Sequence, residues 1–175
     1  MYAVLRRLEA GRNVLRLRLL DGKWTYIDRG LWPAVLRIVA RRRAWQAAGV
    51  SPLGRRILER VNRIGVLDLQ NRARLGGVTL GAAGDAAREL EHRLLVVSYE
   101  IHTLAGLHSK RLESWASWKE RHGARVGGMR EPEARRRIES LVAAMAPEGG
   151  PVRALPWMPA RARRRSPPRR GKAGR

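Results

Sequence analysis

The segment 51–118 constrains the fold more than any other part of the chain, because its capping and turn residues fix the order of its elements. Residues that favour helix N-caps predict three successive helices, which begin at Ser51, Asp68 and Thr79. The last helix covers 79–93, and short strands at 94–101 and 107–113 then flank a tip at 102–106. Three helices followed by a hairpin are the order of a winged helix-turn-helix, so we expect that fold here.

The residues before this segment predict a hairpin and a helix. Leucines alternate with arginines over 15–19, which is typical of a half-buried strand, and Asp21-Gly22 is a strong signal for a two-residue turn. We therefore expect a hairpin at 14–27. Pro33 suits the first turn of a following helix, and Gly49 closes that segment.

The residues after the segment predict two helices and a tail. Ser114 can cap a helix with Trp115 and Trp118 on one face, where core packing is the expected role of the tryptophans. Pro132 begins a further helix whose inward residues are expected to be Ile138, Leu141, Val142 and Met145. From 147 onward Pro, Gly and Arg dominate, which predicts a disordered basic tail with Trp157 as an apolar anchor that docks on the domain.

The expected fold class is α+β and mainly helical, with a winged helix-turn-helix, a short N-terminal hairpin and a disordered basic tail. The predicted parts are an N-terminal hairpin and helix at 1–50 and the winged-helix module at 51–122. A C-terminal helix at 129–146 and the tail at 147–175 follow.

The charge of the chain predicts a polyanionic partner. The net charge is +22, and residues 1–150 still carry +13 without the nine Lys or Arg that follow Pro151. Arginines outnumber lysines 33 to 4, a bias that a GC-rich genome also produces. Guanidinium groups nevertheless form bidentate hydrogen bonds with phosphates and with the edges of guanine bases. An anionic membrane surface is the second kind of polyanion that such a charge attracts, after nucleic acid. We expect double-stranded DNA as the partner and RNA as the alternative, and no membrane.

Other features of the sequence exclude several classes. The chain has no cysteine, which excludes disulfides, thiolate metal sites and cysteine nucleophiles. No apolar run approaches the roughly 20 residues that span a bilayer, and the N-terminus lacks an export signal. We therefore expect a cytoplasmic, nucleoid-associated protein that does not bind membranes.

The predicted nucleic-acid contacts follow from the expected fold. The third helix of a helix-turn-helix enters the major groove, the wing follows the backbone, and the arginines of the tail are expected on phosphates. The residues that we assign to this interface are Arg72, Arg74, Thr79, Arg88, His92, Arg93, Thr103, His108, Lys110 and Arg111.

Four parts of the chain resemble the AlkZ-like winged-helix proteins, a family that includes interstrand-crosslink DNA glycosylases and smaller uncharacterised members. These parts are 25–33 (TYIDRGLWP), 53–65, the turn at 72–76 (RARLG) and the wing with its following helix at 89–118. The resemblance implies DNA binding and, in enzymatic members, hydrolysis of the N-glycosidic bond of alkylated bases. Those enzymes hold the catalytic water with a Gln-x-Gln motif, and neither Gln46 nor Gln70 matches it. No catalytic residue is assigned.

The remaining polar residues have simpler structural roles. His102 and His108 flank the wing tip, but without a cysteine or a clear carboxylate beside them we predict no metal site. Glu89, Glu91 and Glu113 are interpreted as surface or helix-start residues rather than general acids or bases. Glu100 is likewise given no catalytic role. We expect no metal and no small-molecule cofactor.

The expected function is DNA binding without catalysis by this chain, in a protein related to the AlkZ-like repair glycosylases. One alternative is a truncated or divergent glycosylase that acts on alkylated bases. A second alternative is a basic RNA- or ribosome-associated protein. The DNA sequence or lesion that is recognised, the oligomeric state and the pathway do not follow from the sequence.

Overall fold

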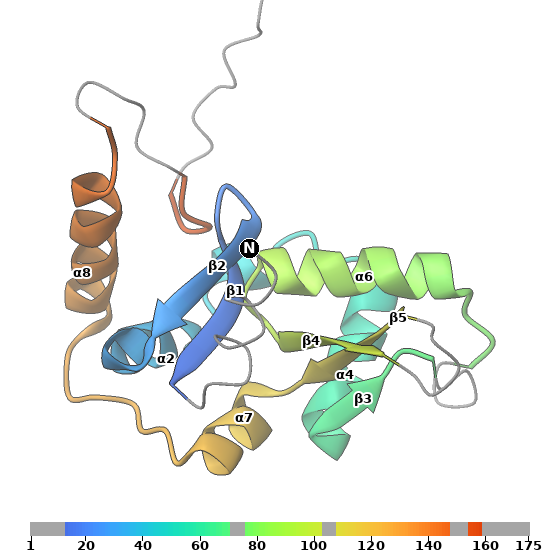
Figure 1. Cartoon of the computed structure of the whole chain (residues 1–175). Helices are drawn as coiled ribbons and strands as arrows, with labels where there is room; N and C mark the ends of the chain where they lie inside the picture. Colours follow the sequence, from blue (N-terminus) through green and yellow to red (C-terminus); the bar gives the residue numbers. More distant parts are fainter. Residues whose placement is uncertain (1–12, 71–75, 103–107, 148–153, 159–175) are drawn as a thin grey trace, which may run out of the picture.

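The computed structural model describes residues 13–70, 76–102, 108–147 and 154–158. Within these ranges the chain is an α+β protein with six α-helices and two small antiparallel sheets, which agrees with the expected fold class (Figure 1). The predicted wing tip at 102–106 lies outside the described residues, except for His102 at its edge.

The predicted N-terminal hairpin is confirmed. β1 (Val14–Leu20) pairs with β2 (Lys23–Asp28), and the turn between them is Asp21-Gly22. Both turn residues have positive φ angles, 51° and 68°, as a two-residue hairpin turn of this kind requires. Leu15, Leu17 and Leu19 of β1 are buried, while its arginines lie on the opposite face.

The helical segment that was expected to continue to Gly49 is divided in two. After a short 3-10 turn at Arg29–Leu31, α2 (Trp32–Val39) has Pro33 in its first turn. α3 (Ala44–Ala47) is a separate single turn. The break falls at the three consecutive arginines 41–43, where Arg42 has a φ of 37°, outside the helical region.

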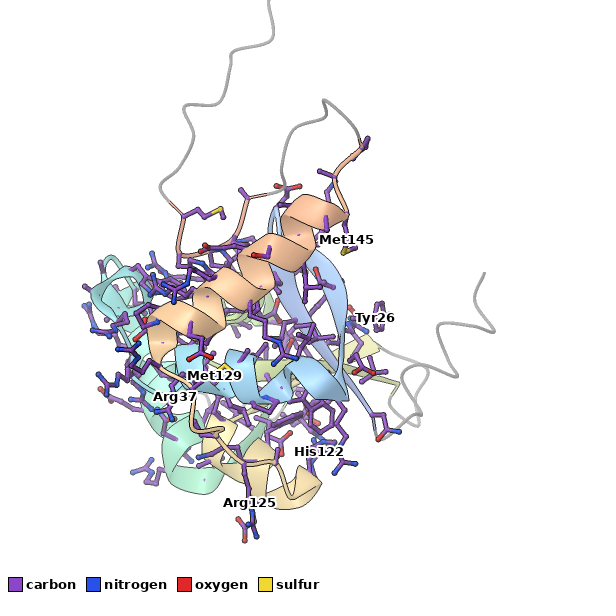
Figure 2. The ribbon with its side chains drawn as sticks, turned by 90° about the vertical axis from the view of Figure 1, so that its left-hand side faces the viewer. Tyr26, Arg37, His122, Arg125, Met129 and Met145 are labelled. Carbon is purple, nitrogen blue, oxygen red and sulfur yellow. The ribbon has the colours of Figure 1, made fainter. Side chains whose placement is uncertain are left out.

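The hairpin and α2 form part of a first hydrophobic core, and two further helices complete it. α7 (Trp115–His122) begins at Ser114, whose Oγ accepts a hydrogen bond from Ser117 N, as predicted. α8 (Glu131–Ala144) packs on α2, and Figure 2 shows it lying across α2 and the hairpin. Trp118 is only 1% exposed and meets Trp32 edge to face at 4.8 Å, so its predicted core role is confirmed.

The second core lies within 50–112. It joins α4 (Pro52–Ile64) and α6 (Leu80–His92) to a sheet of β3 (Val66–Asp68), β5 (His108–Glu113) and β4 (Val97–His102), in that order. The predicted caps at Ser51 and Thr79 are confirmed, since their side chains accept from Gly54 N and Ala82 N. This arrangement is compatible with a winged helix.

The second predicted helix, at 68–75, is wrong at its beginning. Val66 to Asp68 form β3, which pairs with β5, and Asp68 Oδ1 accepts hydrogen bonds from Gln70 N and from Ser109 Oγ. The aspartate thus fixes the end of a strand rather than capping a helix. Residues 71–75 lie outside the described part of the chain.

Two residues that were expected to face the core lie at the surface of α8. Leu141 is 43% and Met145 is 73% exposed. Figure 2 shows Met145 at the far end of α8. The buried face of α8 is instead formed by Ala134, Ile138 and Val142, which are four residues apart.

The C-terminal prediction is partly wrong. Segment 154–158, which falls in the tail expected to be disordered, is docked on the hairpin turn: Asp21 N donates to Ala154 O at 2.9 Å, and Ala154 N donates back to Asp21 Oδ1 at 2.8 Å. Leu155 is buried. Trp157 Nε1 donates to Glu139 Oε1 at 2.7 Å, which confirms the predicted docking of this tryptophan.

Candidate nucleic-acid interface

The exposed face of α6 carries uncharged and mostly small residues over its first turn, before Asp85. A Cβ added at Gly81 or Gly84 would meet no atom within 4 Å, so both glycines border open space. Thr79 Oγ1 is used by the helix cap. Arg88 is exposed, but its guanidinium is paired with Asp85 at 3.2 Å. The predicted recognition helix therefore offers one arginine to a ligand, and that arginine already has an acidic partner.

The C-terminal end of α6 contacts the N-terminal hairpin. A Cβ at Gly22 would lie 3.1 Å from the ring of His92, so the hairpin turn contacts this predicted interface residue. Burial lowers the pKa of His92, and the charge of Arg18 lowers it further. His92 thus lies beside the hairpin turn, where its charged form is disfavoured.

Lys110 is engaged inside the protein. Glu91, whose side chain is 2% exposed, forms ion pairs with Lys110 Nζ at 2.7 Å and with Arg18 Nε at 2.7 Å. The buried carboxylate therefore joins β5, α6 and β1. A buried charge needs such partners, which makes Lys110 part of the fold rather than an available cation.

Arg93 is engaged in the same way. Its guanidinium donates to the carbonyl oxygens of Trp45 and Ala48, and its Nε lies 3.8 Å from Glu89 Oε1. Glu89 in turn accepts from the backbone and the hydroxyl of Ser51. This network connects the end of α6 to α3 and to the first turn of α4.

Arg111 points away from Lys110, because successive side chains of a strand lie on opposite faces. Lys110 faces α6 through Glu91, whereas Arg111 is exposed and stands across from Tyr99 in the β4–β5 register. The two residues were both assigned to the interface, but one flat surface cannot contact both. Strand alternation could have shown this from the sequence.

Three of the predicted contacts, Arg72, Arg74 and Thr103, lie outside the described residues. His108 opens β5 opposite His102 in the strand pairing.

A row of arginines on α4 is the basic feature that the sequence analysis did not assign. Arg56, Arg60 and Arg63 are spaced by four and three residues, which places them on one face of the helix. None of them forms an ion pair with a residue that the structure describes. We call this set the α4 row. Its spacing was a signal available in the sequence.

The α4 row lies close to the beginning of α6. The guanidinium of Arg56 is 3.4 Å from the position of a Cβ at Gly76, in the segment that leads into α6. The two helices differ in charge: α4 has four arginines and one glutamate, whereas α6 has three acids and one arginine. The positive potential of this part of the molecule therefore comes from α4.

The glutamates considered for acid–base chemistry all have partners. Glu113 is buried and accepts from Arg121, Tyr99 and Ser117. Burial raises its pKa, but the hydrogen bonds from Arg121 and Tyr99 outweigh burial, so the pKa is lowered overall. Burial and the carboxylate raise the pKa of Tyr99. Glu100 is paired with Arg16 at 3.2 Å.

Gln46 also has a structural role. It is fully buried, its Oε1 accepts from Arg43 N at 3.0 Å, and its Nε2 donates to Arg93 O at 3.1 Å. The side-chain amide is thus occupied on both sides by backbone groups.

No group of three or more His, Cys, Asp or Glu residues is placed to hold a metal ion in the part of the chain that is described. Among the same residues, none of the helices combines the length and apolar character that crossing a membrane requires.

Comparison with protein-family models, with curated proteins and with solved structures finds no match to this chain. The resemblance to the AlkZ-like proteins therefore stays a prediction.

Proposed function

We propose that this chain binds double-stranded DNA without catalysis, through a winged-helix module at 51–113 with basic extensions. The helix, short strand, helix and hairpin of this segment, with the last strand at the centre of the sheet, support the module. The net charge of +22 supports a polyanionic partner.

The α4 row carries the proposal. Three arginines on one helical face, beside the entry to α6 and without ion pairs to described residues, match a row of backbone phosphates rather than a single small anion. Phosphate contacts position a protein on the duplex and supply most of its non-specific affinity. The N-terminal half of α6 then approaches the groove through Gly81 and Gly84, which have no side chains and border open space.

This arrangement supports weak discrimination among DNA sequences. Base edges are read by arginine, asparagine, glutamine and acidic side chains that reach into the groove. On the exposed part of α6 only Asp85 and Arg88 have such groups, and they are paired with each other. We therefore expect similar affinities for duplexes of different sequence.

The contacts of the glutamates favour a binding protein over an enzyme. Glu91 and Glu113 are buried in ion pairs, and Glu89 holds the beginning of α4. The test of the glycosylase alternative is release of alkylated bases from a duplex, measured as abasic sites. Formation of abasic sites above the level of a protein-free control would contradict the proposal of a non-catalytic protein.

The partner is tested by fluorescence anisotropy with labelled duplex DNA, and with unlabelled competitors of the same length. We expect two duplexes of unrelated sequence to compete within about threefold of each other, as non-specific phosphate binding predicts. A structured RNA that displaces the duplex at a far lower concentration would instead favour the RNA alternative.

A further inference from the structure

A pocket of about 180 Å³ lies where the two cores meet. Its walls come from α2, the arginine-rich break after it, α4, the turn between α6 and β4, α7 and Val126. No motif in the sequence points to it, because the lining is assembled from distant segments. The glutamates and the α4 row do not contribute to it.

The pocket has an apolar floor and a cationic mouth. Leu36, Val39, Leu94 and Leu95 are each at most 5% exposed and form the floor. The polar lining residues are Arg42, Asn62 and Lys119, and the lining includes no acidic side chain. Neither Arg42 nor Lys119 is ion-paired with a described residue.

The backbone is constrained on two sides of the pocket. Arg42 and Leu94 have φ angles of 37° and 52°, which non-glycine residues seldom adopt, and both residues line the pocket. The carbonyl of Leu94 accepts from Trp115 Nε1 at 2.8 Å and from Gln46 Nε2 at 3.4 Å. Strained residues that their surroundings hold in place tend to occur at ligand sites.

We propose that this pocket binds a small organic carboxylate with an apolar body. The apolar floor requires a body without polar groups, and the two cations require an anionic head. Because the indole N–H of Trp115 is already bonded to Leu94, this side chain offers mainly its ring to a ligand. A cavity of about 150 Å³ accommodates benzene, so the volume suits a body of one ring or a short branched chain. The proposal does not depend on DNA binding.

The test uses isothermal titration calorimetry on the full chain with benzoate as the probe. Benzyl alcohol, a neutral molecule of similar shape, tests the contribution of the carboxylate charge. Inorganic phosphate, which has charge but no apolar part, tests the contribution of the apolar body. We expect benzoate to bind at least about tenfold more tightly than either, because a charged hydrogen bond contributes about that factor. Equal binding of benzoate and phosphate, or no binding of benzoate, would overturn the proposal.

Two variants locate the bound carboxylate. Arg42→Gly removes one cation and suits the left-handed backbone at that position. Lys119→Met removes the other and keeps the aliphatic stem. Each is expected to weaken benzoate binding about tenfold. The matched controls are Arg125→Gly and Lys23→Met, which remove exposed cations that do not line the pocket, and Figure 2 shows Arg125 pointing away from the body. Equal weakening by the controls would assign the effect to net charge and reject the pocket.

A third variant tests the pocket without changing charge. Ala116 is exposed on α7 and lines the pocket, so Ala116→Leu places a larger side chain at the opening while the helix is retained. We expect benzoate binding to fall at least tenfold, with an unchanged far-UV circular dichroism spectrum. Unchanged benzoate binding by this variant would place the ligand elsewhere and contradict the proposal.

Discussion

Lys110 Nζ lies 2.7 Å from Glu91 Oε1, in an ion pair whose carboxylate side chain is only 2% exposed. Arg18 of the N-terminal hairpin reaches the other oxygen of the same carboxylate at 2.7 Å. Arg18 and its neighbour on the strand face, Arg16, also stack on Trp24, with their guanidinium carbons 4.3 and 4.0 Å from the ring centroid. The hairpin is therefore fastened to α6 by the ion pair of Arg18, and the contacts with Trp24 hold both arginines within the hairpin.

This relationship predicts that Lys110 matters for stability more than for DNA binding. Lys110→Met should lower the free energy of unfolding by about 1–3 kcal/mol, because Glu91 loses a charged partner and keeps only Arg18. Urea denaturation followed by circular dichroism measures the change. Arg111→Met is the control, and it should change stability by less than about 0.5 kcal/mol because Arg111 is exposed. A larger loss of stability in the control would show that the burial of Glu91 does not decide the effect.

The lowered pKa of Glu113 predicts a loss of stability in acid. A carboxyl whose pKa is lower in the folded state than its ordinary value of 4.5 stabilises the fold above that pH, and its contribution is lost as pH falls through the lowered pKa. Wild type and Glu113→Gln should therefore differ most at pH 6–7 and converge as the pH falls below about 4. Urea denaturation at several pH values tests this. A constant difference across the series would contradict the assignment.

The docked segment 154–158 predicts where the chain can be shortened. A chain that ends at Met158 keeps every described residue, so its stability should equal that of the full chain. A chain that ends at Gly150 loses Leu155 and Trp157 and should be less stable by about 2–4 kcal/mol, from the apolar surface that is no longer buried. Thermal unfolding of the two chains gives the comparison. Equal melting temperatures would mean that the docked segment contributes nothing.

The elements that the sequence predicted well are those with local causes. The turn at Asp21-Gly22 and the caps at Ser51, Thr79 and Ser114 depend on a few neighbouring residues, and the structure has each of them. β3 was missed because three residues carry no periodicity, and only its pairing with β5 makes it a strand. Its aspartate favours a helix start and a strand end equally.

The candidate site was harder to predict because it depends on which cations have acidic partners. The partner of Lys110 is 19 residues away on another element, and Arg18 is farther still, so no local pattern shows that this charge is used. By contrast, the spacing of Arg56, Arg60 and Arg63 was visible in the sequence. The pocket between the cores was not, because its lining comes from segments that meet only in the fold.

The measurement that tests the central claim most directly is a salt titration of binding to duplex DNA with two charge-matched triple variants. One replaces the α4 row by glutamine. The other replaces Arg125, Arg136 and Arg137, which are exposed and lie on or before α8. Both variants are made in the chain that ends at Met158, so that the cations of 159–175 do not hide the difference.

Each lost phosphate contact lowers the slope of log affinity against log salt by about 0.9. We therefore predict a fall of about 2–3 in the slope for the α4 variant and of less than about 1 for the control. Equal falls in the two variants would mean that net charge alone attracts the duplex. An unchanged slope in the α4 variant would contradict the assignment of the interface to α4.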